Sequence, residues 1–225
     1  MGSVRLTTAE ALVRYLAAQR IRVGNREVPI CGGVFAIFGH GNVAGLGAAL
    51  AKSELPVLRG HNEQAMGLAA TAFAKARRRR GFMAVTTSIG PGATNLVTAA
   101  ATARVNRLPL LLLPGDSFAS RFPDPVLQQL EHDQSPDVSV NDCLRPVSAF
   151  FDRIVRPEQL VMSIERAFQV LTDPVACGPV TIALPQDVQV EMLDVPSSFL
   201  EPRVWSYSPP ERRSVRADEA ADRIS

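Results

Sequence analysis

The 225-residue sequence has few cysteines, and their placement excludes two kinds of small stabilised domain. Cys31, Cys143 and Cys177 are an odd number at unrelated spacings, and no CxxC pair occurs. Disulfide frameworks and zinc sites are built on recurring cysteine spacings. We therefore expect free or buried thiols, as in a reducing cytoplasm, and take a cytoplasmic protein as the default.

Long hydrophobic runs and a strong charge of one sign are also missing. No window approaches the roughly 18 apolar residues of a membrane-spanning helix, and the N-terminus MGSVRLTT has no apolar signal region. The net charge is +2, and the one basic run, at residues 77–80, has no aromatic or further basic cluster beside it. We interpret this run as the end of a helix, where positive charge is favourable. The composition predicts no nucleic-acid partner and no membrane partner.

Three common signatures of catalysis or nucleotide binding are absent as well. The sequence has no serine-centred elbow and no metal-spaced histidine pair. Its glycine-rich stretches at residues 39–42 and 88–95 fit neither the dinucleotide fingerprint nor the P-loop, which also needs a lysine. These residues therefore do not favour a cradle for nucleotide phosphates.

The sequence does contain a regular alternation of apolar stretches and helical patterns. Six stretches resemble strands, at residues 34–38, 56–58, 81–87, 108–113, 147–151 and 180–184. A capping box from Thr7 to Glu10 opens a helix that ends near residue 19, and further helical patterns cover residues 43–52, 62–76, 93–105 and 157–171. Runs that are apolar throughout are typical of strands covered on both faces. The alternation predicts an α/β fold, a doubly wound six-stranded parallel sheet with helices on both faces.

Two connecting segments stand out. Residues 24–29 have the composition of a turn. Residues 116–141 are polar, contain prolines and are too long for an ordinary connection. We predict that this second segment is a functional loop with one helical turn near residues 126–131.

The end of the sequence has a different character. From residue 191 onward, prolines are spread through a strand-poor stretch, which is typical of an interdomain linker. A new helical pattern begins at residue 216 and stops after about two turns, too short to bury a face by itself. We therefore predict a first domain at residues 1–190, followed at residues 191–225 by a linker and the start of a truncated central domain.

The helix predicted at residues 62–76 carries a single acid at its start, Glu63. Asn62 is a good N-cap, and the residues behind Glu63 are mostly apolar at helical spacing. In an open parallel sheet, corners between a strand and the following helix face the ligand crevice. Glu63 is therefore either a site residue or an acid that only complements the helix dipole, which is worth about 0.3–1 kcal/mol.

Two further loops at predicted strand ends carry unusual residues. His40 lies between two glycines, and Gly90, Pro91 and Gly92 form a GPG sequence. Glycine permits close backbone approach to a ligand, and helix N-termini offer free amides. The alternatives without a site are that His40 is a structural histidine and that the GPG sequence is only a tight turn, and the residues alone leave both open.

Several motifs in order resemble one enzyme family. HNEQAMGLAATAFAKA, TTSIGPGATN and GPVTIALPQDVQ resemble the pyrimidine-binding domain of thiamine-diphosphate enzymes of the acetohydroxyacid synthase group. More narrowly, FGHGNVAGLGAAL, RLPLLLLPGDSFASR, DPVLQQLE and SVNDCLRPVS resemble the trihydroxycyclohexanedione hydrolase branch of myo-inositol breakdown. Synthases of the group typically have TSGPGATN where this chain has the longer TSIGPGATN, which favours the hydrolase branch.

The resemblance assigns roles to particular residues. It implies that Glu63 binds the aminopyrimidine ring of thiamine diphosphate and is catalytic, and that His40 is a second catalytic residue on the substrate side. It also implies a pyrimidine pocket lined by Ser88, Gly90, Pro91, Gly92 and Asn95. Gln128 and Gln129, in the long loop, are weaker candidates for contact with the substrate.

The resemblance also shows what this chain lacks. Family members bind Mg²⁺ and the diphosphate through a GDG-to-Asn motif in a C-terminal domain, and no such motif occurs here. The implied partner is a second subunit whose C-terminal domain completes the active site. The leading hypothesis is a hydrolase that cleaves the ring C–C bond of a cyclic diketone to give 5-deoxyglucuronate. The alternatives are an acetolactate synthase-like carboligase or decarboxylase and an inactive dimerisation module.

Overall fold

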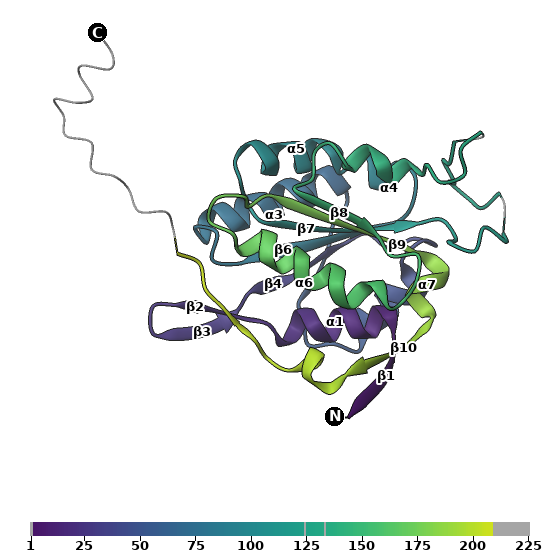
Figure 1. Ribbon diagram of the computed structural model, residues 1–225. Coiled ribbons are helices and arrows are strands. Elements are labelled where there is room, and N and C mark those ends of the chain that lie inside the picture. The colour runs from purple at the N-terminus through teal and green to yellow at the C-terminus, as the bar shows by residue number, and fades with distance from the viewer. Residues whose placement is uncertain (1, 124, 133, 209–225) are drawn as a thin grey trace, which may run out of the picture.

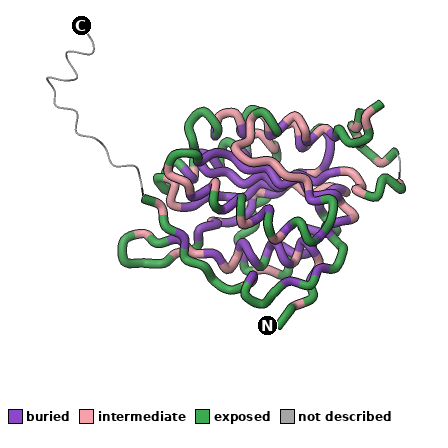
Figure 2. Tube along the Cα trace, viewed as in Figure 1, coloured by how far each residue is buried: buried purple, intermediate pink, exposed green. Residues whose placement is uncertain are grey.

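A six-stranded, fully parallel sheet forms the centre of the computed structural model, which describes residues 2–123, 125–132 and 134–208 (Figure 1). The strand order is β5-β4-β6-β7-β9-β8. The bounds are β4 Cys31–Ala36, β5 Val57–Arg59, β6 Phe82–Thr87, β7 Leu110–Asp116, β8 Phe150–Arg153 and β9 Pro179–Pro185. Every residue of β6, β7 and β9 is buried, as expected for strands with helices on both faces (Figure 2). The predicted fold class is confirmed.

Helices cover the two faces of the sheet and enclose two hydrophobic cores. On one face, α3 (Glu63–Ala76) and α5 (Val97–Val105) pack with residues such as Met66, Val85 and Leu112 (Figure 1). On the other face, α1 (Thr8–Ala18) and α6 (Gln159–Thr172) pack over the larger core. The predicted capping box is present, because Thr7 Oγ1 accepts from Glu10 N and Glu10 Oε2 accepts from Thr7 N, both at 3.1 Å.

The first half of the chain differs locally from the sequence predictions. The predicted turn at residues 24–29 is part of a hairpin of β2 (Arg20–Val23) and β3 (Arg26–Pro29), which Gly24 permits by adopting a φ of 60°. The helix predicted at residues 43–52 begins as a π-helical turn, η1 (Val43–Gly47), before α2 (Ala48–Ala51). The helix predicted at residues 93–105 is divided into α4 (Pro91–Thr94) and α5.

Several strand boundaries also differ from the predictions, among them the start of β4 at Cys31 rather than at residue 34. β7 continues through Pro114 and Gly115 to Asp116, because Pro114 pairs with β6 and the last two residues pair with β9. β8 begins at Phe150 rather than at residue 147, because a 3₁₀ helix, η2 (Val140–Leu144), continues into a turn closed by the bond from Ser148 N to Leu144 O. In place of the predicted helical turn, the bond from Gln129 N to Val126 O closes a single tight turn.

The segment after residue 190 is not strand-poor. α7 (Gln186–Val190) leads into β10 (Met192–Pro196), which pairs antiparallel with β1 (Ser3–Thr7). The helical turn η3 (Ser197–Leu200) follows, and the two-residue β11 (Val204–Trp205) then pairs with β2. Trp205 is buried, and its Nε1 donates to Gln19 Oε1 at 3.1 Å. The domain boundary at residue 190 therefore stays a prediction, and the helical pattern from residue 216 lies outside the described residues.

The three cysteines are free thiols, as predicted. Burial raises the pKa of Cys31 and of Cys177 to about 11 each, so both are protonated near neutral pH. Within the described part of the chain, no helix has both the length and the apolar character needed to cross a membrane.

Candidate active site

The loops that follow β4, β5 and β6 meet at the carboxyl edge of the sheet. The contact between the first and third loops is very close: a Cβ added to Gly39 would lie 2.5 Å from Ser88 Oγ, and one added to Gly41 would lie 2.4 Å from Ile89 Cγ2. Only glycine fits at either position without displacing the neighbouring loop. The parallel sheet therefore places His40, Glu63 and the GPG sequence on one edge.

Glu63 is the first residue of α3, but it is not the residue that caps the helix. Asn62 Oδ1 accepts from Ala65 N at 2.8 Å and satisfies that role. The Glu63 carboxylate turns toward the neighbouring loop, where Oε2 accepts from Asn95 Nδ2 at 2.9 Å. A Cβ on Gly92 would lie 3.3 Å from Glu63 Oε1, so glycine keeps the space beside that oxygen open. Glu63, Gly92 and Asn95 thus lie together, and their roles stay predictions.

Two buried polar atoms of this edge have no hydrogen-bond partner among the described residues. They are His40 Nε2 and Ser88 Oγ, from the two loops in close contact. Leaving a buried polar group unpaired typically costs about 1–3 kcal/mol, so such atoms are rare in folded proteins. Both are therefore available to a ligand.

Two buried amide side chains hold the His40 loop in place, and the sequence did not single them out. Asn42 Oδ1 accepts from Gly39 N at 2.9 Å, while Nδ2 donates to Ile37 O and Thr86 Oγ1, each at 3.0 Å. Gln189 Nε2 donates to Gly41 O at 2.8 Å, and its Oε1 accepts from Leu46 N at 3.0 Å. Asn42 follows the glycines directly, and Gln189 ends the PQDVQ sequence, but neither spacing indicates a clamp.

The long loop after β7 reaches the GPG sequence through its backbone. Gly90 has a φ of 63°, and a Cβ there would lie 2.2 Å from Gln128 O. Gln128 itself has a φ of 61°. Gln129 Oε1 accepts from Val126 N at 2.8 Å, and its side chain lines a neighbouring cavity rather than the space beside Glu63. Pro91 lies exposed at the first position of α4, where its missing N–H costs nothing.

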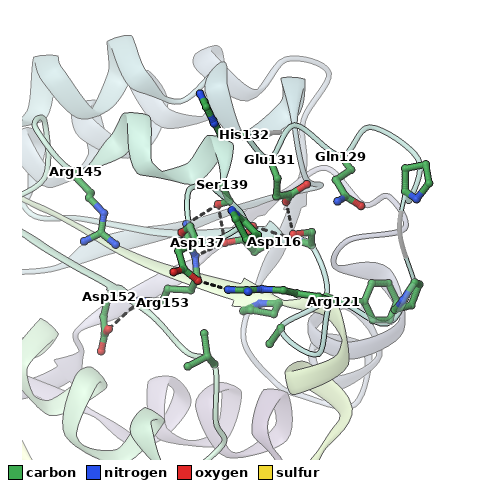
Figure 3. A pocket seen from close by; sticks show the side chains of 18 residues that line it. Asp116, Arg121, Gln129, Glu131, His132, Asp137, Ser139, Arg145, Asp152 and Arg153 are labelled. Atoms are coloured by element: carbon green, nitrogen blue, oxygen red, sulfur yellow. Dashed lines mark hydrogen bonds and ion pairs between the residues drawn. The ribbon is translucent and has the colours of Figure 1, made fainter. Parts of the chain in front are cut away.

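That cavity was not predicted from the sequence. It has a volume of about 590 Å³ and lies where β7, β8 and β9 end, under the long loop (Figure 3). Arg153 lies at its floor: Nε donates to Asp116 Oδ2 at 2.8 Å, and the guanidinium also reaches Asp142 at 3.0 Å, Ser139 Oγ at 2.5 Å and Asp137 O at 3.0 Å. One half-buried cation therefore ties the two ends of the long loop to β8.

The electrostatics of this cluster are set by competition between burial and ion pairing. Burial alone would raise the pKa of Asp142, but hydrogen bonds from Arg145 and Arg153 outweigh it and hold the pKa below the ordinary 3.8. Burial alone would lower the pKa of Arg153, but Asp116 and Asp142 together raise it. Asp142 and Arg153 are therefore both charged near neutral pH. In the described ranges, no three histidine, cysteine or acidic side chains are placed to hold a metal ion.

Comparison with known proteins supplies a family and a set of relatives. The profile described as "Thiamine pyrophosphate enzyme, N-terminal TPP binding domain" matches residues 6–136. The chain is 51% identical, over its whole length, to a 3D-(3,5/4)-trihydroxycyclohexane-1,2-dione hydrolase of Geobacillus thermodenitrificans, and it spans 35% of that protein. Proteins of the same name from Bacillus subtilis and Lacticaseibacillus casei are 53% and 54% identical over 89% and 90% of the chain, which spans 32% of each. The chain thus spans about a third of these relatives.

Proposed function

Since the chain belongs to the thiamine pyrophosphate enzyme family through its N-terminal TPP-binding domain, we propose that it binds the aminopyrimidine half of thiamine diphosphate where β4, β5 and β6 end. The observation that carries the proposal is the placement of Glu63. Its carboxylate is fixed by Asn95 on one oxygen, and the space beside its other oxygen is kept open by Gly92.

The residues at this edge fit such a ring. A flat heteroaromatic ring needs close backbone approach, which Gly90 and Gly92 permit, and polar groups at its rim, which Glu63 provides. The unpartnered atoms of His40 and Ser88 lie in the adjoining loops and are satisfied when a polar ligand binds. Glu63 would hold a ring nitrogen by a hydrogen bond and could share a proton with it, while Asn95 keeps the Glu63 carboxyl group in one orientation.

Thiamine diphosphate, when bound, stabilises carbanions and so permits cleavage of a C–C bond beside a carbonyl. The chain's own contribution to such a reaction is to orient the pyrimidine through Glu63 and to offer His40 for proton transfer on the substrate side. Asn42 and Gln189 hold the backbone around His40, so the imidazole is presented from a fixed loop.

For the whole enzyme we propose the activity that the names of the relatives give: hydrolysis of 3D-(3,5/4)-trihydroxycyclohexane-1,2-dione in inositol breakdown. The support is the level of identity over this chain, 51–54% for three such proteins. The diphosphate and Mg²⁺ are then bound outside this chain, by the C-terminal domain of a second subunit. A cytoplasmic location fits a small-molecule enzyme with free thiols.

Titration of the ¹⁵N-labelled chain with thiamine tests the pyrimidine site directly. We expect amide shifts at Gly90, Gly92 and Asn95, and binding at least about tenfold weaker in Glu63→Gln, which keeps the shape but removes the charged acceptor. Glu54→Gln makes the same chemical change at an exposed position and should bind like the parent. Equal affinity of Glu63→Gln and the parent would refute the proposal. So would the absence of shifts at about 10 mM thiamine, because a ligand with a binding free energy of only about 4 kcal/mol is bound at that concentration.

A further inference from the structure

We propose that the cavity beneath the long loop is a subsite for a neutral, hydroxyl-rich ring, and that Glu131 is its hydrogen-bond anchor. The identity of the ring rests on the proposed function, because the relatives are named for a trihydroxylated six-membered ring. The cavity and its chemistry come from the structure alone. Its volume of about 590 Å³ lies in the usual range for small-molecule sites.

The arginines that line the cavity are all engaged by carboxylates, which argues against an anionic ligand. Arg153 pairs with Asp116 and Asp142, Arg145 with Asp142, and Arg121 with Asp137. A phosphate or carboxylate site normally needs a guanidinium or ammonium that is free to pair with the ligand. Within the described lining, every guanidinium already has an acidic partner.

Glu131, unlike these arginines, offers the ligand a polar atom that has no partner in the described part of the chain. Its Oε1 accepts from Ser117 Oγ, which fixes the carboxylate, whereas Oε2 is buried and has no partner among the described residues (Figure 3). A buried carboxylate oxygen without a donor is costly, and a hydroxyl group is a small neutral donor that satisfies it.

Part of the remaining lining suits the carbon face of such a ring. Seven of the lining residues, from the long loop and from the strand ends, are apolar: Phe118, Ala119, Pro123, Pro125, Pro136, Val155 and Pro185. A polyhydroxylated ring presents C–H groups on its faces and hydroxyls at its rim. Apolar residues beside polar ones therefore match both of its surfaces.

The cavity adjoins the proposed pyrimidine site at two points. Gly115, just before the cavity residue Asp116, packs so closely on the His40 loop that a Cβ there would lie 2.5 Å from Gly41 O. Gln128, just before the cavity residue Gln129, packs against Gly90. The segment that lines the cavity thus contacts both the His40 loop and the GPG loop, as expected for a neighbouring substrate subsite.

Titration of the ¹⁵N-labelled 225-residue chain with myo-inositol, a six-membered ring with only hydroxyl groups, tests the inference. We expect amide shifts concentrated at Ser117, Phe118 and Glu131, and a dissociation constant at least about tenfold higher in Glu131→Gln, because hydrogen bonds to charged groups are the stronger ones. Glu201→Gln makes the same change at an exposed position in the last part of the described chain and should bind like the parent. Ser117→Ala, which frees the Glu131 carboxylate to rotate, should weaken binding by about three- to tenfold.

Each outcome decides the matter. The subsite would be overturned by amide shifts outside the cavity when inositol is added, or by an inositol affinity of Glu131→Gln within twofold of the parent. Binding of inorganic phosphate but not of inositol in the cavity would overturn it as well. Thiamine titration of the same samples separates this failure from a failure of the proposed function: Glu131→Gln should bind thiamine like the parent, and Glu63→Gln should bind inositol like the parent. Thermal unfolding of each variant shows whether it is folded.

Discussion

Replacement of Arg153 by alanine should destabilise the domain more than any other arginine substitution around the cavity. The Arg153 guanidinium makes four polar contacts and is only 16% exposed, and its partner Asp116 is 4% exposed. Arg153→Ala therefore leaves a buried carboxylate without its counter-ion. Removing one member of a buried pair typically costs about 3–5 kcal/mol.

The local contacts place the expected cost near the lower end of that range. Asp116 keeps two donors after the substitution, Ser117 N at 2.9 Å and Ser139 Oγ at 3.1 Å, so its charge is not left entirely unsatisfied. We expect the free energy of unfolding to fall by about 3 kcal/mol, a large share of the about 5–15 kcal/mol that stabilises most domains. The melting temperature should fall by about 6–12 °C, at about 2–4 °C per kcal/mol for a chain of this size.

Arg121→Ala is the matched control. Arg121 pairs with Asp137 beside the same cavity, but the two side chains are 55% and 86% exposed. Exposed pairs are worth about 0–1 kcal/mol, so this variant should unfold almost like the parent. Urea titration followed by circular dichroism gives both free energies, and unchanged m-values would show that the two variants unfold from equally compact states.

A cost below about 1 kcal/mol for Arg153→Ala, equal to that of Arg121→Ala, would refute the reasoning, because Arg153 would then behave as an exposed ion pair. Adding Asp116→Asn to Arg153→Ala tests the mechanism. If the penalty comes from the abandoned charge, the double variant should recover part of the loss, with a coupling energy of about 0.5–3 kcal/mol. Additive losses would assign the cost of Arg153→Ala to its other contacts.

Three further predictions concern pH, the proposed cofactor and the end of the described chain. The pKa of Asp142 in the folded chain is lowered below 3.8, so its ionised form stabilises the fold fully above that value and loses this effect as the pH falls through the folded pKa. The difference in free energy of unfolding between Asp142→Asn and the parent, measured by urea titration, should therefore be full at pH 7 and shrink below about pH 4. In the complete enzyme, Glu63→Gln should slow deuterium exchange at C2 of bound thiamine diphosphate by about 10²-fold or more, as measured by quench-flow and NMR. An exchange rate within about threefold of the parent would mean that Glu63 only complements the helix dipole. Trp205→Ala should lower the free energy of unfolding by about 3–5 kcal/mol, since a buried aromatic ring is removed. A loss below about 1 kcal/mol in urea titration would instead support a linker that starts at residue 191.

The central strands could be predicted because their environment is uniform. β6, β7 and β9 are buried along their whole length, so each appears in the sequence as a mainly apolar run. β2, β3 and β10 alternate or are largely exposed, and their signal is too short to separate from loop. The same difference explains why residues 191–205 resemble a linker in sequence although β10 pairs with β1 and β11 pairs with β2.

The two parts of the site differ in a similar way. Glu63, Gly92 and Asn95 lie in short motifs, so the sequence could suggest that they act together. Asp116 and Arg153, by contrast, meet across 37 residues of sequence. Their contact depends on the register of β7 and β8 on either side of β9, and no spacing in the sequence encodes it.

The buried amides of Asn42 and Gln189 connect the fold to the proposed chemistry. The loop after β4 leaves the sheet to present His40, and it packs against Ser88 and Ile89 of the loop after β6. Gln189 satisfies Gly41 O and Leu184 O from the far side of the sequence, and it is 1% exposed. A buried amide with satisfied donors and acceptor admits only one arrangement of its partners, because every alternative leaves polar groups unpaired. The His40 loop is therefore fixed by α7 before any ligand arrives, which is the condition for a preorganised site.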